Sequence, residues 1–212
     1  MRLNSGYDST ETGSNIEKVY IEDVSSEKGM AVGGAVTKGS KEQNANINTF
    51  EVKNVKSTDN WSLGIWTNKS NLNSDYLSVT DVASVNSDAY GLYSQESCNI
   101  EADIAYVGDV SSENGVALGL YINGGSIANF KNLQVEQVSS DAKFAAAVNV
   151  RNSNLTTDNA VINLPDDEAF YGDYSGFYDG VASSNASKIN EIALRSVSGG
   201  DINWSNAKDG TY

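Results

Sequence analysis

Residues 76–100 read YLSVTDVASVNSDAYGLYSQESCNI, and residues 104–127 repeat their pattern as IAYVGDVSSENGVALGLYINGGSI. The first copy opens with apolar residues at Leu77, Val79 and Val82. It continues through a polar turn into a second strand-like segment, Gly91-Leu92-Tyr93. Two copies this similar, 28 residues apart, indicate an internal repeat, and such a repeat decides the fold.

The apolar hexamer of this repeat recurs along most of the chain. Its first residue falls at positions 19, 50, 77, 105, 133, 159 and 192, at intervals of 31, 27, 28, 28, 26 and 33. The copy at Asn159 is weaker, because a polar residue takes its first apolar position. A second series closes the strand after the turn. Its members are Trp66, Tyr93, Tyr121, Asn149 and Tyr178. Two independent series with nearly one period predict coils that stack directly on one another.

Each hexamer contains a bend. Alternating apolar and polar residues are typical of a strand with one buried face. The third and sixth positions are three residues apart, so both can face the interior only if the strand bends between them. A polar residue precedes the sixth position in every copy. This polar ladder consists of Asp23, Asn54, Asp81, Asp109, Gln137 and Asn163. We expect its members to be turn residues at the surface, with a Ca²⁺ site between Asp81 and Asp109 as the alternative.

The pattern predicts an all-β fold, a right-handed parallel β-helix (β-solenoid) of about seven coils with a period of about 27–28 residues. Each strand would pair with its equivalent one coil later, about 4.8 Å away. An antiparallel sandwich is the alternative, although it does not require a constant spacing between equivalent residues. We expect residues 1–15 to form a polar lead-in or partial cap. Residues 16–212 would form one domain, an excerpt of a longer solenoid, with an irregular inserted segment at 165–191.

The composition excludes several classes of function. A net charge of −14 argues against nucleic acid or an anionic membrane as a partner, because both attract basic patches. The chain has no histidine, the most common catalytic base, and no basic cluster of the kind that a lyase for acidic sugars needs. No apolar run reaches the ~18 residues of a membrane-spanning helix. Cys98 is expected to pack as a small apolar residue. We predict no catalytic activity, no cofactor and no metal.

The repeat unit resembles the pertactin-like passenger region of bacterial autotransporter adhesins. The resemblance rests on the apolar hexamer, the Ser/Asn turn, the Gly91-Leu92-Tyr93 type of strand and the following Ser-x-Ile, over residues 16–205. It implies export across the outer membrane, presentation at the bacterial cell surface, and adhesion or self-association. The signal and the membrane barrel of that family are expected outside this fragment.

The outward aromatic residues are the candidate contact site. If Leu63, Ile65, Leu92, Leu118 and Leu120 face inward, strand alternation places the aromatic residues outside. They would stack on neighbouring coils and offer a flat strip to sugar rings or to a partner protein. The alternative is that stacked rings only brace adjacent coils. The predicted contact residues are Trp66, Tyr93, Tyr121 and Tyr178.

The inserted segment 165–191 also carries aromatic and acidic side chains, which suits either a binding loop or a solvated turn. The function expected from the sequence is a non-catalytic surface segment that acts as a stalk and contacts a host or bacterial surface glycan or protein. The alternative is a β-helical carbohydrate-active protein, such as a phage tailspike or a fragment of a glycan hydrolase or lyase. Such enzymes need paired carboxylates, and 28 acidic residues make a suitable pair inevitable.

Overall fold

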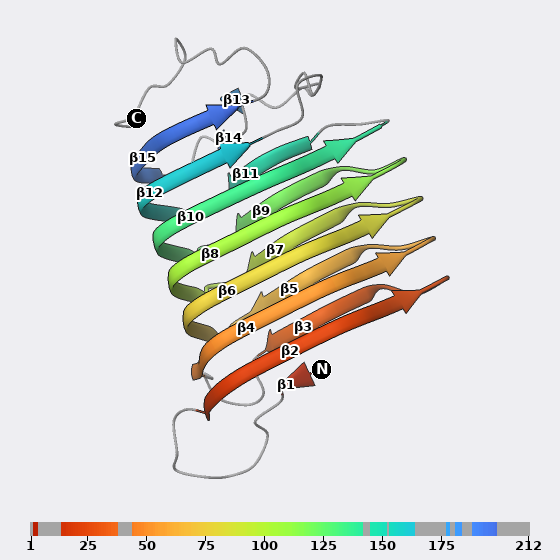
Figure 1. Ribbon diagram of the computed structural model, residues 1–212, viewed down its shortest axis with the longest axis horizontal. Coiled ribbons are helices and arrows are strands. Elements are labelled where there is room, and N and C mark those ends of the chain that lie inside the picture. Colours follow the sequence, from red (N-terminus) through yellow and green to blue (C-terminus); the bar gives the residue numbers. More distant parts are fainter. Residues whose placement is uncertain are drawn as a thin grey trace.

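A computed structural model describes residues 2–3, 14–37, 44–141, 145–151, 153–163, 177–178, 181–183 and 188–198 (Figure 1). Every regular element in these ranges is a β-strand. The described residues contain no helix with the length and apolar character to cross a bilayer. The prediction of an all-β fold is confirmed.

Each coil consists of one long and one short strand, and equivalent strands of successive coils form two sheets (Figure 1). The long strands are β2 (Ser14–Ser26), β4 (Asn44–Ser57), β6 (Asn71–Ser84), β8 (Asn99–Ser112), β10 (Ile127–Ser140), β12 (Asn154–Asn163) and β15 (Lys188–Ser198). The short strands are β1 (Arg2–Leu3), β3 (Ala31–Thr37), β5 (Ser62–Asn68), β7 (Ala89–Gln95), β9 (Ala117–Asn123), β11 (Ala145–Arg151), β13 (Phe177–Tyr178) and β14 (Val181–Ser183).

The coils stack in parallel register, as the repeat predicts. Val107 pairs with Val79 on one side and with Val135 on the other, and all three side chains are buried. Among the described strands only β13 and β14 pair antiparallel. An antiparallel sandwich is therefore excluded. The stack makes about five turns rather than the seven expected, since β2 to β11 supply five pairs of long and short strands.

The sixth copy of the hexamer begins at Ala160, one residue after the predicted Asn159. Leu133 pairs with Ala160, and Asn132 pairs with Asn159. The buried series therefore passes through Ala160, which is fully buried, and not through Asn159. The hexamer at Asn159 looked weak because it began on the outward-facing residue.

The core is a narrow apolar layer between the two sheets. Val52, Val79, Val107 and Val135 of the long strands face Gly33, Gly64, Gly91 and Gly119 of the short strands. Outside the core, asparagine side chains bridge the coils: Asn73 Nδ2 donates to Asn46 Oδ1 at 2.9 Å, and Asn46 Nδ2 to Asn15 Oδ1 at 2.8 Å. Such amide ladders fix the register because each side chain satisfies its equivalent in the next coil.

The two predicted irregular regions lie mostly outside the described residues. Within the expected lead-in, β1 pairs with β3 as a further parallel strand. Within the inserted segment 165–191, only β13, β14 and the start of β15 are described.

Candidate functional site

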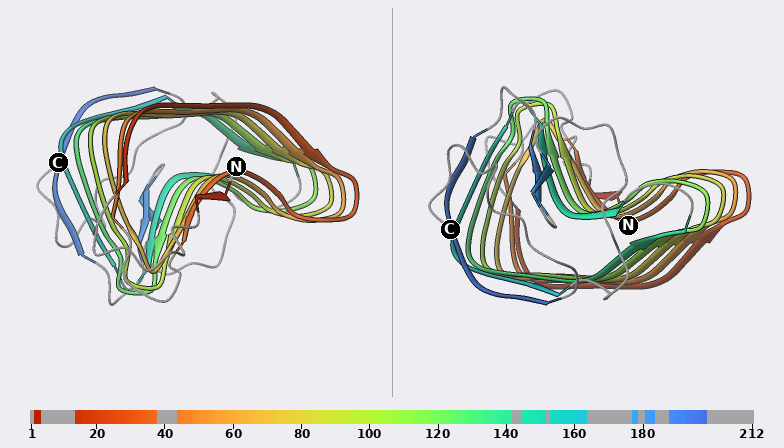
Figure 2. Two further views of the ribbon diagram at one scale, coloured as in Figure 1. Left: turned by 90° about the horizontal axis from the view of Figure 1, so that it is seen from below. Right: turned by 90° about the horizontal axis from the view of Figure 1, so that it is seen from above.

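The short strands bend, and the outer surface of the coil is concave along this bend (Figure 2). In β5, two consecutive residues face the interior. A Cβ on Gly64 would lie 2.2 Å from Cγ1 of Val79, and Ile65 belongs to the main core. Alternation is therefore interrupted, and Leu63 and Trp66 share the outer side in a second, separate apolar cluster. Residues three apart in the sequence become neighbours on the concave face.

Four rings form an aromatic cluster in this concavity: Trp61, Tyr90, Tyr93 and Tyr121. Trp66 packs against the apolar cluster that contains Tyr90 and Tyr93. Tyr93 and Tyr121 of adjacent coils are stacked, with ring centroids 5.2 Å apart and planes 8° apart. Tyr90 stacks on both tyrosines, at 5.2 Å from Tyr93 and 5.7 Å from Tyr121. Trp61 meets the edges of this stack, 5.7 Å from Tyr90 and at 75° to it. Stacked and edge-to-face contacts of this kind stabilise aromatic pairs beyond their burial alone.

Tyr90 and Tyr93 are buried, Tyr121 is partly buried, and Trp61 is the exposed rim of the cluster. Tyr90 and Tyr93 retain only 7% and 8% of their accessible surface, whereas Trp61 retains 38%. The hydroxyl of Tyr90 donates to Asp88 Oδ2 at 2.9 Å, and that of Tyr93 donates to Gln95 Oε1 at 2.7 Å. The stack therefore holds its rings in fixed positions and presents Trp61 to solvent.

The hydroxyl groups of the two buried tyrosines both have a raised pKa. Burial raises the pKa of the Tyr90 hydroxyl, and the nearby Asp88 carboxylate raises it further. Burial is also the main cause that raises the pKa of Tyr93. Both phenols therefore stay protonated at neutral pH and act as hydrogen-bond donors. A catalytic base would need a pKa near the working pH, which neither group has.

Three of the four predicted contact residues come together, and the fourth does not. Trp66 pairs with Tyr93, and Tyr93 with Tyr121, as the spacing predicted. The series continues to Asn149 and then to Ala182 in β14. Tyr178 lies in β13, which pairs antiparallel with β14, so its position in the ladder is taken by Ala182. Ala182 follows Asn149 by 33 residues, which is longer than the regular period of 27–28. A prediction from the regular period therefore chose Tyr178 instead of Ala182.

Sequence reasoning missed Trp61 and Tyr90. It assigned Leu63 and Leu118 to the interior with Ile65, Leu92 and Leu120, which is wrong: Leu63 and Leu118 pack in the outer cluster. Strict alternation led to this error. The signal that would have revealed the bend is a small residue at the middle of the short strands, glycine in β3, β5, β7 and β9 and Ala147 in β11, since the first of two successive inward residues lies against the long strands.

Five of the six predicted members of the polar ladder form the bend of the long strands, whereas the sixth, Asn163, pairs with Glu136 and not with Gln137. Asp23, Asn54, Asp81, Asp109 and Gln137 all have positive φ, between 51° and 61°. Aspartate and asparagine adopt this left-handed conformation more readily than most residues. Across neighbouring coils, Asn54 Nδ2 donates to Asp23 Oδ1. Among the described residues, no three His, Cys, Asp or Glu side chains converge as a metal site would require.

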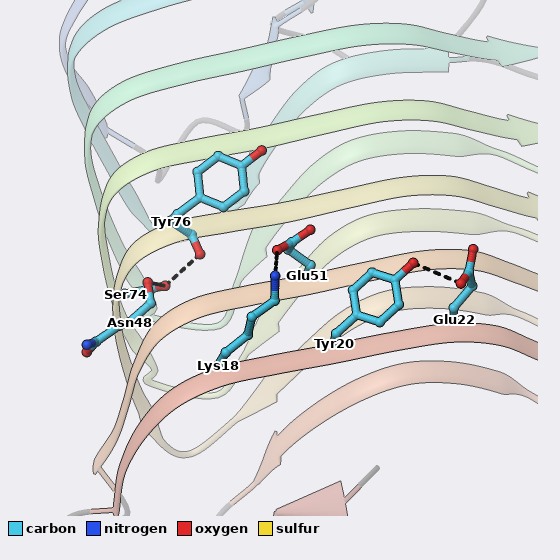
Figure 3. A network of polar contacts seen from close by, with 7 residues as sticks. All are labelled: Lys18, Tyr20, Glu22, Asn48, Glu51, Ser74 and Tyr76. Atoms are coloured by element: carbon cyan, nitrogen blue, oxygen red, sulfur yellow. Dashed lines mark hydrogen bonds and ion pairs between the residues drawn. The ribbon is translucent and has the colours of Figure 1, made fainter.

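The outer face of the long strands carries charged and aromatic side chains in short-range pairs (Figure 3). Lys18 Nζ lies 2.7 Å from Glu51 Oε1 and 5.9 Å from the centre of the Tyr20 ring. The Tyr20 hydroxyl donates to Glu22 Oε2 at 2.8 Å. These pairs link neighbouring coils or neighbouring outward residues, and none of them places a nucleophile beside a base.

Comparisons with protein-family models, with curated proteins and with solved structures found no match to this chain.

Proposed function

We propose that this chain is a non-catalytic segment of an exported protein, held at a bacterial cell surface as a rigid stalk. Its repeat resembles the passenger region of autotransporter adhesins, and the parallel β-solenoid is compatible with that type of fold. The aromatic cluster contacts a surface glycan or protein, with Trp61 as its exposed member. The observation that carries this proposal is a set of stacked, hydrogen-bonded rings on an outer face of the coil.

Rigidity supports this role because little ordering entropy remains to be lost on binding. Tyr90, Tyr93 and Tyr121 are fixed by mutual stacking, and strands on both sides hold their backbones. An exposed tryptophan beside such rings offers a flat apolar face with a polar N–H, which suits both sugar rings and protein side chains.

The test compares binding of the labelled chain to surface glycans, to bacterial cells and to host cells before and after Trp61→Ala. Trp61 retains 38% of its accessible surface and lies at the rim of the cluster, so this substitution is expected to preserve the fold and to weaken binding at least about tenfold. Ile127→Ala is the matched control, because Ile127 is 42% exposed and lies at the start of a long strand, away from the cluster.

Equal binding by the Trp61→Ala and Ile127→Ala variants would show that the aromatic cluster only braces the coils. The same preparations are assayed for the release of reducing ends from the glycans. Release would favour the alternative, a β-helical glycan hydrolase or lyase, over a binding segment.

A further inference from the structure

Two asparagines of the chain are followed directly by glycine, Asn114 and Asn123. Asparagine is a thermolabile residue, and a following glycine lacks the side chain that would keep its backbone nitrogen away from the asparagine amide. Asn114 lies in the turn between β8 and β9, and Asn123 is the last residue of β9. The two sites have the same dipeptide, and the fold treats them differently.

The fold holds the Asn114–Gly115 pair in place. The backbone N–H of Gly115 donates to Ser112 Oγ at 2.7 Å, and Gly115 is buried. The side-chain amide of Asn114 donates to the carbonyl oxygen of Val85 at 3.1 Å, and the backbone N–H of Asn114 donates to the same oxygen at 2.9 Å. The nitrogen of Gly115 and the amide of Asn114 are therefore both engaged, and these bonds must break before the two groups can meet.

The Asn123–Gly124 pair is held less tightly. Gly124 and Gly125 are exposed, and their φ angles are 68° and 80°. The N–H of Gly124 donates to the carbonyl oxygen of Arg151 at 3.3 Å, beyond the usual range of about 2.7–3.2 Å. Two successive glycines at the end of a strand allow this place to open locally while the rest of the coil stays folded.

A third asparagine isolates the effect of the following residue. Asn68 is the last residue of β5, as Asn123 is the last residue of β9, so the two take matching places in the short sheet. Lys69 follows Asn68 and has a positive φ of 49°. The Cβ of Lys69 restricts the approach of its backbone nitrogen to the amide of Asn68. Asn68 therefore has the location of Asn123 without the glycine.

We propose that Asn123 is a site of spontaneous deamidation in the folded protein and that the fold protects Asn114. The nitrogen of Gly124 attacks Cγ of Asn123, the new N–Cγ bond closes a succinimide ring, and Nδ2 leaves as ammonia with the proton of the Gly124 N–H. A water molecule then opens the ring. Cleavage of the new N–Cγ bond gives aspartate, and cleavage of the original peptide bond gives isoaspartate. This inference does not depend on the aromatic cluster.

The two products change the stack in different ways. Asn123 pairs with Arg151 of the next coil, so the aspartate product places a carboxylate beside a guanidinium group. The isoaspartate product adds one carbon to the main chain and displaces the turn to β10 from the register of the neighbouring coils. We therefore expect the isoaspartate form to have the lower unfolding midpoint in urea.

The test is incubation of the folded chain at mildly alkaline pH and physiological temperature, followed by tandem mass spectrometry of its peptides. We expect an acid to replace the amide at Asn123 at least about tenfold faster than at Asn114, whose hydrogen bonds must break first. Asn68 should stay unchanged over the same period. Peptides that contain the modified Asn123 should separate into aspartate and isoaspartate forms.

The control is the same incubation in guanidinium chloride, where Asn114 and Asn123 should react at similar rates because the difference comes from the fold. Ser112→Ala removes the acceptor of the Gly115 N–H, so it should accelerate the reaction at Asn114 and leave Asn123 unaffected. Urea unfolding verifies that this variant is folded. Equal rates at Asn114 and Asn123 in the folded chain would overturn the proposal, as would an unreactive Asn123 in a folded chain that reacts once unfolded.

Discussion

At the scale of single residues, the glycine column shows how thin the core is. A Cβ on Gly91 would lie 2.4 Å from Cγ1 of Val107 and 2.6 Å from the carbonyl oxygen of Gly119. Both distances are too short for real contacts, and one of the partners is backbone. The φ angle of Gly91 is not positive, so this glycine is required by space and not by backbone conformation. The strands β3, β5, β7 and β9 approach the long strands this closely because the position lacks a side chain.

Gly91→Val is therefore expected to lower the free energy of unfolding by about 1–3 kcal/mol, the range typical of an overpacked core. The new side chain would push β7 away from Val107, and the bend at Leu92 would open. Urea unfolding followed by circular dichroism measures the change. Thr80→Val is the control, since Thr80 is only half-buried in β6. Equal midpoints for Gly91→Val and the unmodified chain would contradict the geometry.

Asp109 provides a prediction on pH dependence. It has a φ of 53° and lies in the polar ladder. Burial is the main cause that raises its pKa, and the charges of Asp81 and Glu136 raise it further. Because the folded-state pKa lies above the unfolded value, stability falls as the pH rises from the unfolded pKa through the folded one. The charged carboxylate is thus unfavourable in the folded protein at neutral pH.

Asp109→Asn is expected to raise the urea midpoint at about pH 7, because asparagine also suits a positive φ and carries no charge. The gain should disappear toward about pH 3, below the ordinary aspartate pKa of about 3.9, where both side chains are neutral. Glu113→Gln serves as the control, since it removes one carboxylate from an exposed turn. A gain that is equal at both pH values would indicate a cause other than ionisation.

At the scale of the structural element, one serine organises each turn between a long and a short strand. Ser112 Oγ accepts from the backbone N–H of Gly115 at 2.7 Å and donates to the carbonyl oxygen of Ser87, in the preceding coil, at 2.7 Å. Ser84 and Ser57 make the same two kinds of bond. Each serine is buried. The hydroxyl therefore closes its own turn and attaches it to the turn of the preceding coil.

Ser112→Ala is expected to cost about 1–3 kcal/mol of stability, because it leaves a buried N–H and a carbonyl oxygen without their partner. Ser111→Ala is a matched control, since the neighbouring side chain is only partly buried and on the opposite face. Thermal or urea unfolding of the two variants gives the difference. Similar stabilities would mean that water replaces the hydroxyl and that the turn serines are not structural.

The long strands could be predicted from the sequence because their bends fall at a polar residue with apolar neighbours on each side. Asp81 between Val79 and Val82 has this form, and the bend there is confirmed by a φ of 58°. Cys98 was also predicted correctly as a buried residue. It takes a position that serines hold in neighbouring coils, and its backbone N–H donates to Ser126 Oγ.

The short strands could not be predicted to the same degree, because their bend is concave and places two inward residues in succession. Apolar residues then occur on both faces. Leu63 and Ile65 look equivalent in the sequence but pack in different clusters.

At the scale of the whole molecule, acidic charge is spread over a stack that has few compensating cations. Of the ion pairs in the described residues, Lys18–Glu51, Lys69–Glu96 and Lys131–Asp103 all have partly exposed side chains. Pairs of this kind contribute about 0–1 kcal/mol each and are weakened by salt. The repulsion among carboxylates acts over the whole stack and corresponds to a net charge of −14. Salt screens that repulsion as well.

Because the chain carries a net charge of −14 and the ion pairs of its described part are exposed and weak, screening of repulsion should exceed screening of attraction. We expect the unfolding temperature to rise with sodium chloride concentration, by about 2–4 °C for each 1 kcal/mol gained in a chain of this size. The rise should shrink at about pH 4, where part of the carboxylates are neutral. A falling unfolding temperature at neutral pH would mean that the ion pairs outweigh the repulsion, so that attraction between charged columns would hold the coils together. In that case Lys18→Met would destabilise the stack far more than an exposed pair allows.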